Sequence, residues 1–231
     1  EAFTVRTRRG WETGAWNGRK ALIEFEDVRQ LGDEDYNSGI NGKLLYPTIA
    51  DPEVTELNRL QIAWTPTKTF GATLGRQRIV FDDQRFIGNV GWRQDEQTFD
   101  AVRADLAGGK FKLAVAYLDQ VNRTAAEAQD WDSESWLANA SSPGPDAFKP
   151  TAFVYALDFD NSRANSNITY GVRATGKAKL APVTLAYSGS YAHQTDYGKN
   201  PASFDLDYWG GDLAATYKIV TVKAGYESLE G

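Results

Sequence analysis

The stretch Phe111-Lys112-Leu113-Ala114-Val115-Ala116-Tyr117 alternates large apolar side chains at odd positions with lysine or alanine at even positions. Residues 98–106 repeat the pattern, with Val102 on one side and Arg103 and Asp105 on the other. Alternation with a period of two indicates a β-strand whose two sides meet different environments. A soluble sandwich turns its apolar side inward, whereas a transmembrane barrel turns that side outward to lipid.

The composition limits the class of protein. The chain has 231 residues, of which 13% are aromatic and 21 are glycine, with no cysteine and a formal net charge of −6. This length suits one large all-β domain or two small ones. Glycine and aromatic residues suit the turns and interface girdles of a barrel, and the lack of cysteine excludes disulfides and thiolate metal sites. No run approaches the roughly 18 apolar residues of a transmembrane helix.

Twelve strand patterns follow one another, joined alternately by short turns and by longer polar loops such as 32–56, 82–97 and 125–134. Asn17-Gly18 is the strongest of the short hairpin signals. Strands are expected at residues 4–16, 20–29, 57–64, 71–81, 98–106, 110–121, 135–141, 151–159, 168–180, 183–196, 204–217 and 220–228. Transmembrane barrels have short turns at one end and longer loops at the other.

The sequence therefore predicts an all-β, antiparallel, up-and-down transmembrane β-barrel. A soluble sandwich, a solenoid or a large lipocalin-like barrel would share part of the pattern. We expect residues 1–231 to be a single outer-membrane barrel domain that lacks its C-terminal strands.

The charged side chains are assigned to a lumen wall by placing the apolar side of each strand toward lipid. The clearest apolar stripe, expected to face lipid, is formed by Phe153, Tyr155, Leu157 and Phe159. The wall is then expected to contain Arg6, Arg8, Glu24, Glu26, Arg59, Arg76, Arg78, Arg103, Asp105, Arg173 and Lys223.

The fourth strand does not fit a simple alternation. Arg76 and Arg78 share the alternation of Leu74, so placing both arginines in the lumen requires a bulge near Gly75. A lipid-facing arginine near the membrane midplane costs about 2–4 kcal/mol, which favours the lumen for both.

The loop 82–97 joins two strands that carry inward arginines. Its side chains Arg85, Trp92 and Arg93 can pair with a lumen wall, and its glycines allow it to fold inward. We therefore predict that this loop constricts the pore.

The wall is rich in arginine, which suits an anionic solute because guanidinium binds carboxylates bidentately. Seven inward arginines against Glu24, Glu26 and Asp105 leave an excess of about four positive charges, which predicts an anion-selective pore. The alternative is that these arginines and carboxylates form buried ladders that hold a plugged barrel together.

Signals for other chemistry are weak. Ser190 and His193 suggest the nucleophile and base of a membrane-embedded hydrolase, yet three residues apart on a strand they face opposite sides. The acidic loops have no register typical of a calcium loop, and they suit contact with solvent or lipopolysaccharide better. A structural barrel that anchors a surface layer is the third possibility.

Several motifs resemble the alginate-export family of outer-membrane porins. They are Gly75-Arg76-Gln77-Arg78-Ile79, Gln84 to Gln94, Gln97-Thr98-Phe99-Asp100, Tyr155 to Asn161, Gln194 to Gly198 with Asn200-Pro201, and Lys223 to Glu227. The resemblance covers nearly the whole chain. It implies a monomeric barrel of about eighteen strands with an electropositive pore, in the outer membrane of a Gram-negative bacterium.

The expected function is thus a passive channel, not an enzyme, that passes alginate-like anionic polysaccharide or smaller acidic sugars. No cofactor and no metal are expected. The expected partners are outer-membrane lipid, lipopolysaccharide and the solute. The net negative charge argues against nucleic acid as a partner.

Overall fold

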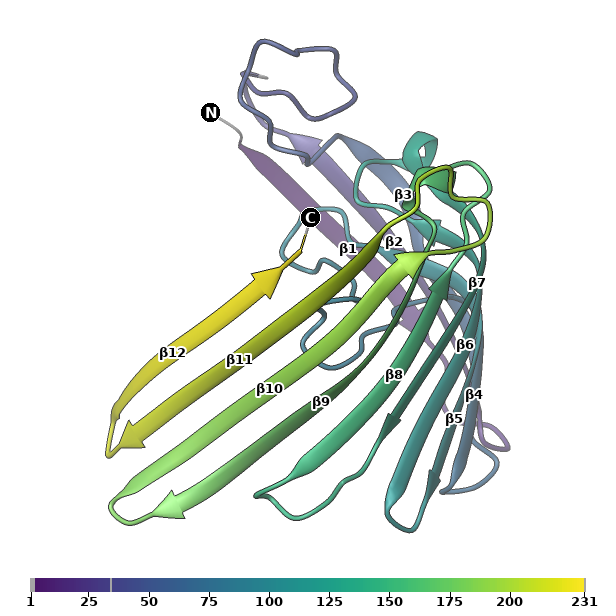
Figure 1. Cartoon of the computed structure of the whole chain (residues 1–231). Helices are drawn as coiled ribbons and strands as arrows, with labels where there is room; N and C mark the ends of the chain where they lie inside the picture. Colours follow the sequence, from purple (N-terminus) through teal and green to yellow (C-terminus); the bar gives the residue numbers. More distant parts are fainter. Residues whose placement is uncertain (1–2, 34, 231) are drawn as a thin grey trace. The chain divides into compact units, whose positions relative to one another are not determined.

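Each of twelve β-strands pairs with the next one in the chain in this computed structural model, which describes residues 3–33 and 35–230. The pairs are antiparallel and the order runs from β1 to β12 without a crossover (Figure 1). The strands are β1 (Thr4–Glu12), β2 (Arg19–Gln30), β3 (Val54–Trp64), β4 (Phe70–Gln77), β5 (Thr98–Gly108), β6 (Phe111–Asn122), β7 (Trp131–Ser141), β8 (Lys149–Leu157), β9 (Asn167–Leu180), β10 (Val183–Asp196), β11 (Asp205–Tyr217) and β12 (Val220–Leu229). The expected all-β, up-and-down architecture is confirmed.

Helical structure is confined to two short 3₁₀ turns in connections, η1 (Glu127–Gln129) and η2 (Arg163–Asn165), as far as the described residues show. Within the same residues, no helix is long and apolar enough to cross a membrane.

The strands divide into two compact units. Unit 1 comprises residues 1–104 and 117–134, and unit 2 comprises residues 105–116 and 135–231. Unit 1 therefore contains β1 to β4, and unit 2 contains β8 to β12.

The hairpin between β1 and β2 has the turn that its sequence predicts. Asn17 and Gly18 both have positive φ angles, of 47° and 72°, as the two central residues of a type I′ turn require. Trp16 and Arg19 close the turn with two backbone hydrogen bonds, of 2.9 and 2.8 Å. A Cβ at Gly18 would lie 2.7 Å from the carbonyl oxygen of Thr65, so glycine is also needed there for close packing.

Strand β4 ends at Gln77, whereas the alternation predicted a strand as far as residue 81. Gly75 has a φ of +107°, a conformation that other residues rarely adopt. Beyond it the chain leaves the sheet, and Ile79 and Phe81 become buried. Gly75 thus allows an irregular backbone conformation two residues before the strand ends, while the pairing with β3 continues through Gly75 to Arg76.

The apolar side of unit 1 is formed by exposed side chains in adjacent strands. Ile23 pairs with Leu60 and Ala21 with Ile62, so these four residues lie on one side of the sheet. Leu60 and Ile62 are 50% and 55% exposed. In a transmembrane barrel such a side faces lipid.

The aromatic stripe of β8 lies on the opposite side from the one predicted. Phe153 and Tyr155 are buried, with their rings stacked 4.9 Å apart, and Phe159 just beyond the strand is buried as well. Leu157 is half-buried. Val154, which lies between Phe153 and Tyr155 in the sequence, is 44% exposed on the other side of the strand.

Two contacts explain this correction. The Phe153 ring occupies the space left by the missing side chain of Gly171 on the neighbouring strand. The Tyr155 hydroxyl accepts a 2.9 Å hydrogen bond from the Asn139 amide. A tyrosine hydroxyl needs such a partner when it is buried, and lipid offers none.

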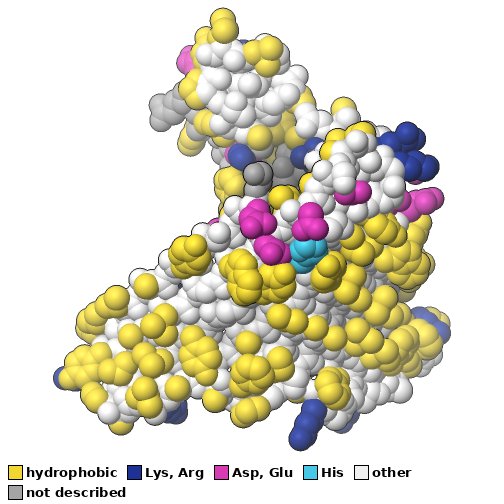
Figure 2. Space-filling view, viewed as in Figure 1, with side chains coloured by type: hydrophobic (Ala, Val, Ile, Leu, Met, Phe, Trp, Pro, Cys, Tyr) yellow, Lys and Arg dark blue, Asp and Glu magenta, His cyan; other side chains and the backbone are white. Residues whose placement is uncertain are grey.

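The apolar side of unit 2 is the side of Val154. Tyr170 pairs with Val154, and Val172 continues that side along β9. Further exposed apolar side chains there include Tyr187, Trp209 and Leu213. Figure 2 shows hydrophobic side chains spread over this face of β9 to β12.

Replacement of Gly75 tests the account of the irregular backbone conformation at this position. In Gly75→Ala, the added Cβ would lie 2.2 Å from the carbonyl oxygen of Leu60 and would sit at an unfavourable φ. We expect the free energy of unfolding to fall by about 1–3 kcal/mol. Urea titration in detergent, followed by tryptophan fluorescence, measures this loss.

Gly189→Ala is the matched control, because this strand glycine has no atom within 4 Å of the added Cβ. Its free energy of unfolding should stay within experimental error of the native value. Equal losses in the two variants would contradict the account.

Candidate functional site

A cluster of arginines and carboxylates lies on the polar side of β1 to β3, opposite the apolar side of unit 1. The register of the strands places it there. Arg8 pairs with Glu26 between β1 and β2, and Glu24 pairs with Arg59 between β2 and β3. Directly opposed residues lie on the same side of a sheet, so these charges meet.

The geometry of the cluster is that of tight ion pairs. Arg59 binds Glu24 bidentately, with its Nε 3.0 Å and its Nη2 2.8 Å from the two carboxylate oxygens. The Nε of Arg8 donates to Glu26, whose side chain is fully buried. Arg6 lies 3.8 Å from the same carboxylate. Bidentate and charge-assisted pairs of this kind are the strong ones.

Glu96 is the centre of the cluster, although it comes from the connection between β4 and β5. Its carboxylate accepts hydrogen bonds from Arg78 at 2.6 Å, Asn58 at 2.8 Å and Asn89 at 2.9 Å, and it lies 3.4 Å from Arg8. The side chain is 1% exposed. A buried charge is stable only with such partners.

The connection 78–97 is bound to β1 and to the connection between β2 and β3. Arg6 donates two 2.9 Å hydrogen bonds to the backbone carbonyls of Arg93 and Gln94. The Gln94 amide donates to the Thr4 hydroxyl at 2.7 Å, and the Gln94 backbone donates to Asp51 at 3.1 Å. The connection therefore lies against the polar side of these strands.

The three residues predicted to constrict the pore lie in this connection. Trp92 is 77% exposed, and the Arg93 guanidinium lies over its ring, 4.2 Å from the centroid. Arg93 also lies 4.0 Å from Asp51. The side chain of Arg85 is exposed.

Arg76 and Arg78, which the sequence placed on one wall, have different surroundings. Arg78 joins the cluster through Glu96. Arg76 binds Asp100 bidentately, at 2.8 and 2.9 Å, and pairs in register with the exposed Leu60. The Arg76 Nη1 also donates a 3.2 Å hydrogen bond to the backbone carbonyl of Leu57, and the Arg76 side chain is only 23% exposed.

The remaining predicted wall residues have other surroundings. The Arg103 guanidinium lies 5.3 Å from the centroid of the Phe81 ring in unit 1. In unit 2, Asp105 is half-buried in β5, and Arg173 donates a 3.1 Å hydrogen bond to the Ser190 hydroxyl. Lys223 is exposed on β12.

Several acidic and amide residues of the site were missed in the sequence. They are Glu56, Asn58, Asp95, Glu96 and Asp100. The connection 82–97 was read for its cationic and aromatic groups, and its adjacent carboxylates Asp95 and Glu96 were the overlooked signal. With them Arg8, Arg59, Arg76 and Arg78 each have a carboxylate partner, and the excess of about four positive charges over the whole wall stays a prediction.

Asp95 is an unusual member of this set. Its side chain is fully buried, and no described donor reaches either carboxylate oxygen. Burial, together with the negative charge of neighbouring Glu56, raises the pKa of Asp95 to about 9. The two carboxyls can hydrogen-bond to each other only when one of them carries a proton.

A family model for alginate export matches residues 2–227. The chain belongs to the alginate export family. No curated protein matches it significantly. Membership in this family places the chain in a bacterial outer membrane.

Solved structures of similar fold include three proteins from Pseudomonas species. OpdK of Pseudomonas aeruginosa, determined with vanillate, is 13% identical with a TM-score of 0.76, and the match covers 100% of this chain and 62% of OpdK. OccD3 of the same species is 13% identical with a TM-score of 0.75, covering 100% of this chain and 53% of OccD3. A BenF-like porin from Pseudomonas fluorescens Pf-5 is 15% identical with a TM-score of 0.72, covering 99% and 60%.

At these identities the likeness establishes the fold alone. The chain spans between 53% and 62% of the length of these three proteins.

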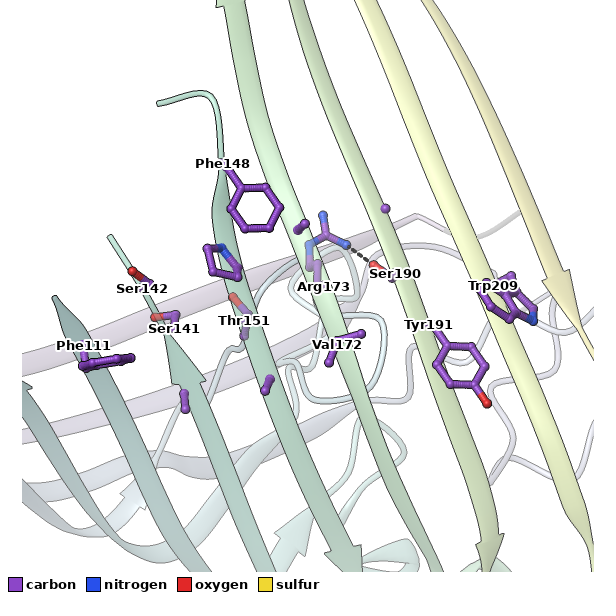
Figure 3. A pocket seen from close by; sticks show the side chains of 15 residues that line it. Phe111, Ser141, Ser142, Phe148, Thr151, Val172, Arg173, Ser190, Tyr191 and Trp209 are labelled. Carbon is purple, nitrogen blue, oxygen red and sulfur yellow. Dashed lines mark hydrogen bonds between the residues drawn. The ribbon is translucent and has the colours of Figure 1, made fainter. Parts of the chain in front are cut away.

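The apolar side of unit 2 in this alginate-export-family chain is grooved. A cavity of ≈ 640 Å³ is lined by small residues such as Ala152 and Gly189. The aromatic side chains Phe148, Tyr191 and Trp209 also line it (Figure 3). Almost no polar surface lines it. It therefore suits contact with lipid and not with a charged solute.

The serine and histidine considered for hydrolysis lie on different sides of β10. Ser190 pairs with Arg173 on the polar side of unit 2, whereas His193 pairs with Tyr170 on the apolar side. The His193 Nδ1 lies 2.9 Å from Asp207, an acidic partner that the sequence did not reveal. Figure 2 shows the histidine among acidic side chains. Within the described residues, no group of three or more histidine, aspartate or glutamate side chains is placed so that it could hold a metal ion.

The buried Asp95 predicts a pH dependence of stability. An unfolded aspartate has a pKa of about 3.9, so the folded state, with a raised pKa, loses relative stability as the pH rises from about 4 toward 9. Asp95→Asn removes this loss. We expect the variant to be more stable than the native chain by about 1–3 kcal/mol at pH 8, with little difference at pH 4.

Urea titrations at both pH values measure the difference. Asp83→Asn, at an exposed aspartate of the same connection, should show no such pH-dependent gain. A destabilised Asp95→Asn at pH 8 would mean that the ionised carboxylate has a favourable partner.

Proposed function

We propose that this chain forms the wall of a passive outer-membrane channel for anionic saccharides, either alginate-like polyuronate or smaller acidic sugars. The observation that carries the proposal is the fixed array of guanidinium and carboxylate groups on the polar side of unit 1. Membership in the alginate export family supports the same solute class. The proposal involves no enzymatic step, cofactor or energy source.

The array suits an anion that carries hydroxyl groups better than an anion without them. Arg8, Arg59 and Arg78 are held in place by Glu24, Glu26 and Glu96, and a guanidinium has five N–H donors, of which a carboxylate occupies two. The remaining donors can bind carboxylate or hydroxyl oxygens of a sugar. The Glu24 carboxylate, which is 15% exposed, can accept hydrogen bonds from sugar hydroxyls, which chloride or sulfate cannot donate.

The connection 78–97 supports a constricted pathway. It is fixed to the polar side of the strands by Arg6, Gln94 and Glu96. In a barrel that side borders the lumen, so the connection narrows the space through which a solute passes.

Planar-bilayer recording of the purified chain tests the proposal. We expect discrete conductance steps and a modest preference for chloride over potassium, since the unit 1 arginines are neutralised and only part of the positive charge acts on the solute. Oligomers of galacturonate should block the chloride current. A protein without conductance steps would instead be the structural barrel or the hydrolase, and a potassium preference would contradict the anionic solute.

Shortening the connection tests the constriction. Removal of residues 84–92 should raise the single-channel conductance, because it clears part of the lumen. The deletion takes away Asn89, but Arg8, Asn58 and Arg78 remain to hold Glu96. Removal of residues 199–202, in the connection between β10 and β11, is the control and should leave the conductance unchanged. Equal conductance of the first variant and the native channel would exclude a constricting role.

A further inference from the structure

A second cavity lies on the polar side of unit 2, and lysines line it. Two rows of residues cross the strands there. Lys177 of β9, Ala186 of β10, Ala214 of β11 and Lys223 of β12 form one row, since each is paired with the next. The adjacent row is formed by Lys149, Thr175, Ser188 and Asp212. Together they line a cavity of ≈ 480 Å³.

The cavity opens on the side of the strands away from lipid. Tyr187 and Leu213, which alternate with Ser188 and Asp212 along their strands, are exposed on the apolar side. Because successive side chains of a strand point to opposite faces, the lysines and hydroxyls point to the polar side. In a transmembrane barrel that side borders the lumen.

The lysines differ from the arginines of unit 1 in their pairing. Lys149 lies 2.9 Å from Asp146 in the connection between β7 and β8. Neither Lys177 nor Lys223 forms an ion pair with any residue that the structure describes. Two ammonium groups therefore remain available to a ligand.

The pKa of Asp146 supports the conclusion that lysines gather at this cavity. A hydrogen bond from Lys149 lowers the pKa of Asp146, and the charges of Lys149, Lys177 and Lys179 lower it further. These ammonium groups are thus close enough to act on one carboxylate at the edge of the cavity.

Hydroxyl and carboxylate groups lie between the lysines. The Ser188 hydroxyl donates a 3.1 Å hydrogen bond to Asp212, and Thr175 lies beside Ser188 in the same row. Such groups can exchange hydrogen bonds with the hydroxyls of a sugar. Neighbouring strands lie about 4.8 Å apart, so the backbones of Lys177 and Lys223 are about 14 Å apart, and one short oligosaccharide can contact both lysines.

We propose that this lysine-lined cavity is a binding subsite for the carboxylated sugar residues of the solute. The inference rests on the proposed function, whose solute class it makes specific. Lys177 and Lys223 bind the carboxylates of different sugar residues, and Thr175, Ser188 and Asp212 bind the hydroxyls between them.

Isothermal titration of the full chain in detergent with a galacturonate trimer tests the subsite without requiring a channel. The double variant Lys177→Gln/Lys223→Gln should bind the trimer about ten-fold or more weakly than the native chain, because two charge-assisted hydrogen bonds are lost. Lys177→Arg/Lys223→Arg should keep most of the affinity, which shows that the loss in the first variant is one of charge. Lys110→Gln, in the exposed turn between β5 and β6, is the matched control and should bind normally.

The neutral sugar maltotriose should not bind measurably to the native chain. Unchanged affinity of the glutamine variant for the galacturonate trimer would overturn the subsite, as would sulfate binding as tightly as the trimer. Native binding without any bilayer conductance would refute the channel and leave the subsite standing. Bilayer conductance by a native chain that does not bind the trimer would refute the subsite and leave the channel supported.

Discussion

The burial of one carboxylate, that of Glu96, is the constraint on which the polar side of unit 1 depends. An ionised carboxylate with 1% exposure is stable only if donors surround it. Its partners are Arg8 from β1, Asn58 from β3, and Arg78 and Asn89 from its own connection. Satisfying this single charge therefore fixes the connection against the strands and sets the orientation of two arginines.

Pairing with carboxylates changes how the arginines of unit 1 act on a solute. The arginines of unit 1 are held by carboxylates, so they act as an ordered array of donors more than as a source of net positive potential. The unpaired cations among the described wall residues include Lys177 and Lys223 of unit 2. An anionic sugar in this account is positioned by paired arginines and attracted by unpaired lysines.

The fold could be predicted from the sequence because its signals are local. Alternation identified all twelve strands, and Asn17-Gly18 identified the first hairpin. The side of β8 could not be predicted, because both of its sides are apolar and only Gly171 and Asn139, on other strands, decide where its rings pack. The partners of Glu96 were missed for a related reason, since contacts between residues 8, 58 and 96 have no signature in a single sequence.

The central claim is that the connection 78–97 lies against β1 on the polar side of the sheet. Because the chain has no cysteine, the double variant Thr4→Cys/Gln94→Cys can be tested with a short bifunctional thiol reagent in intact outer membranes. The account predicts efficient cross-linking between these positions, whose native side chains lie 2.7 Å apart, and none between Thr4→Cys and Thr67→Cys, which lies in the turn at the opposite end of the strands of unit 1. Failure of the first pair to cross-link, with both thiols shown to be reactive, would contradict it.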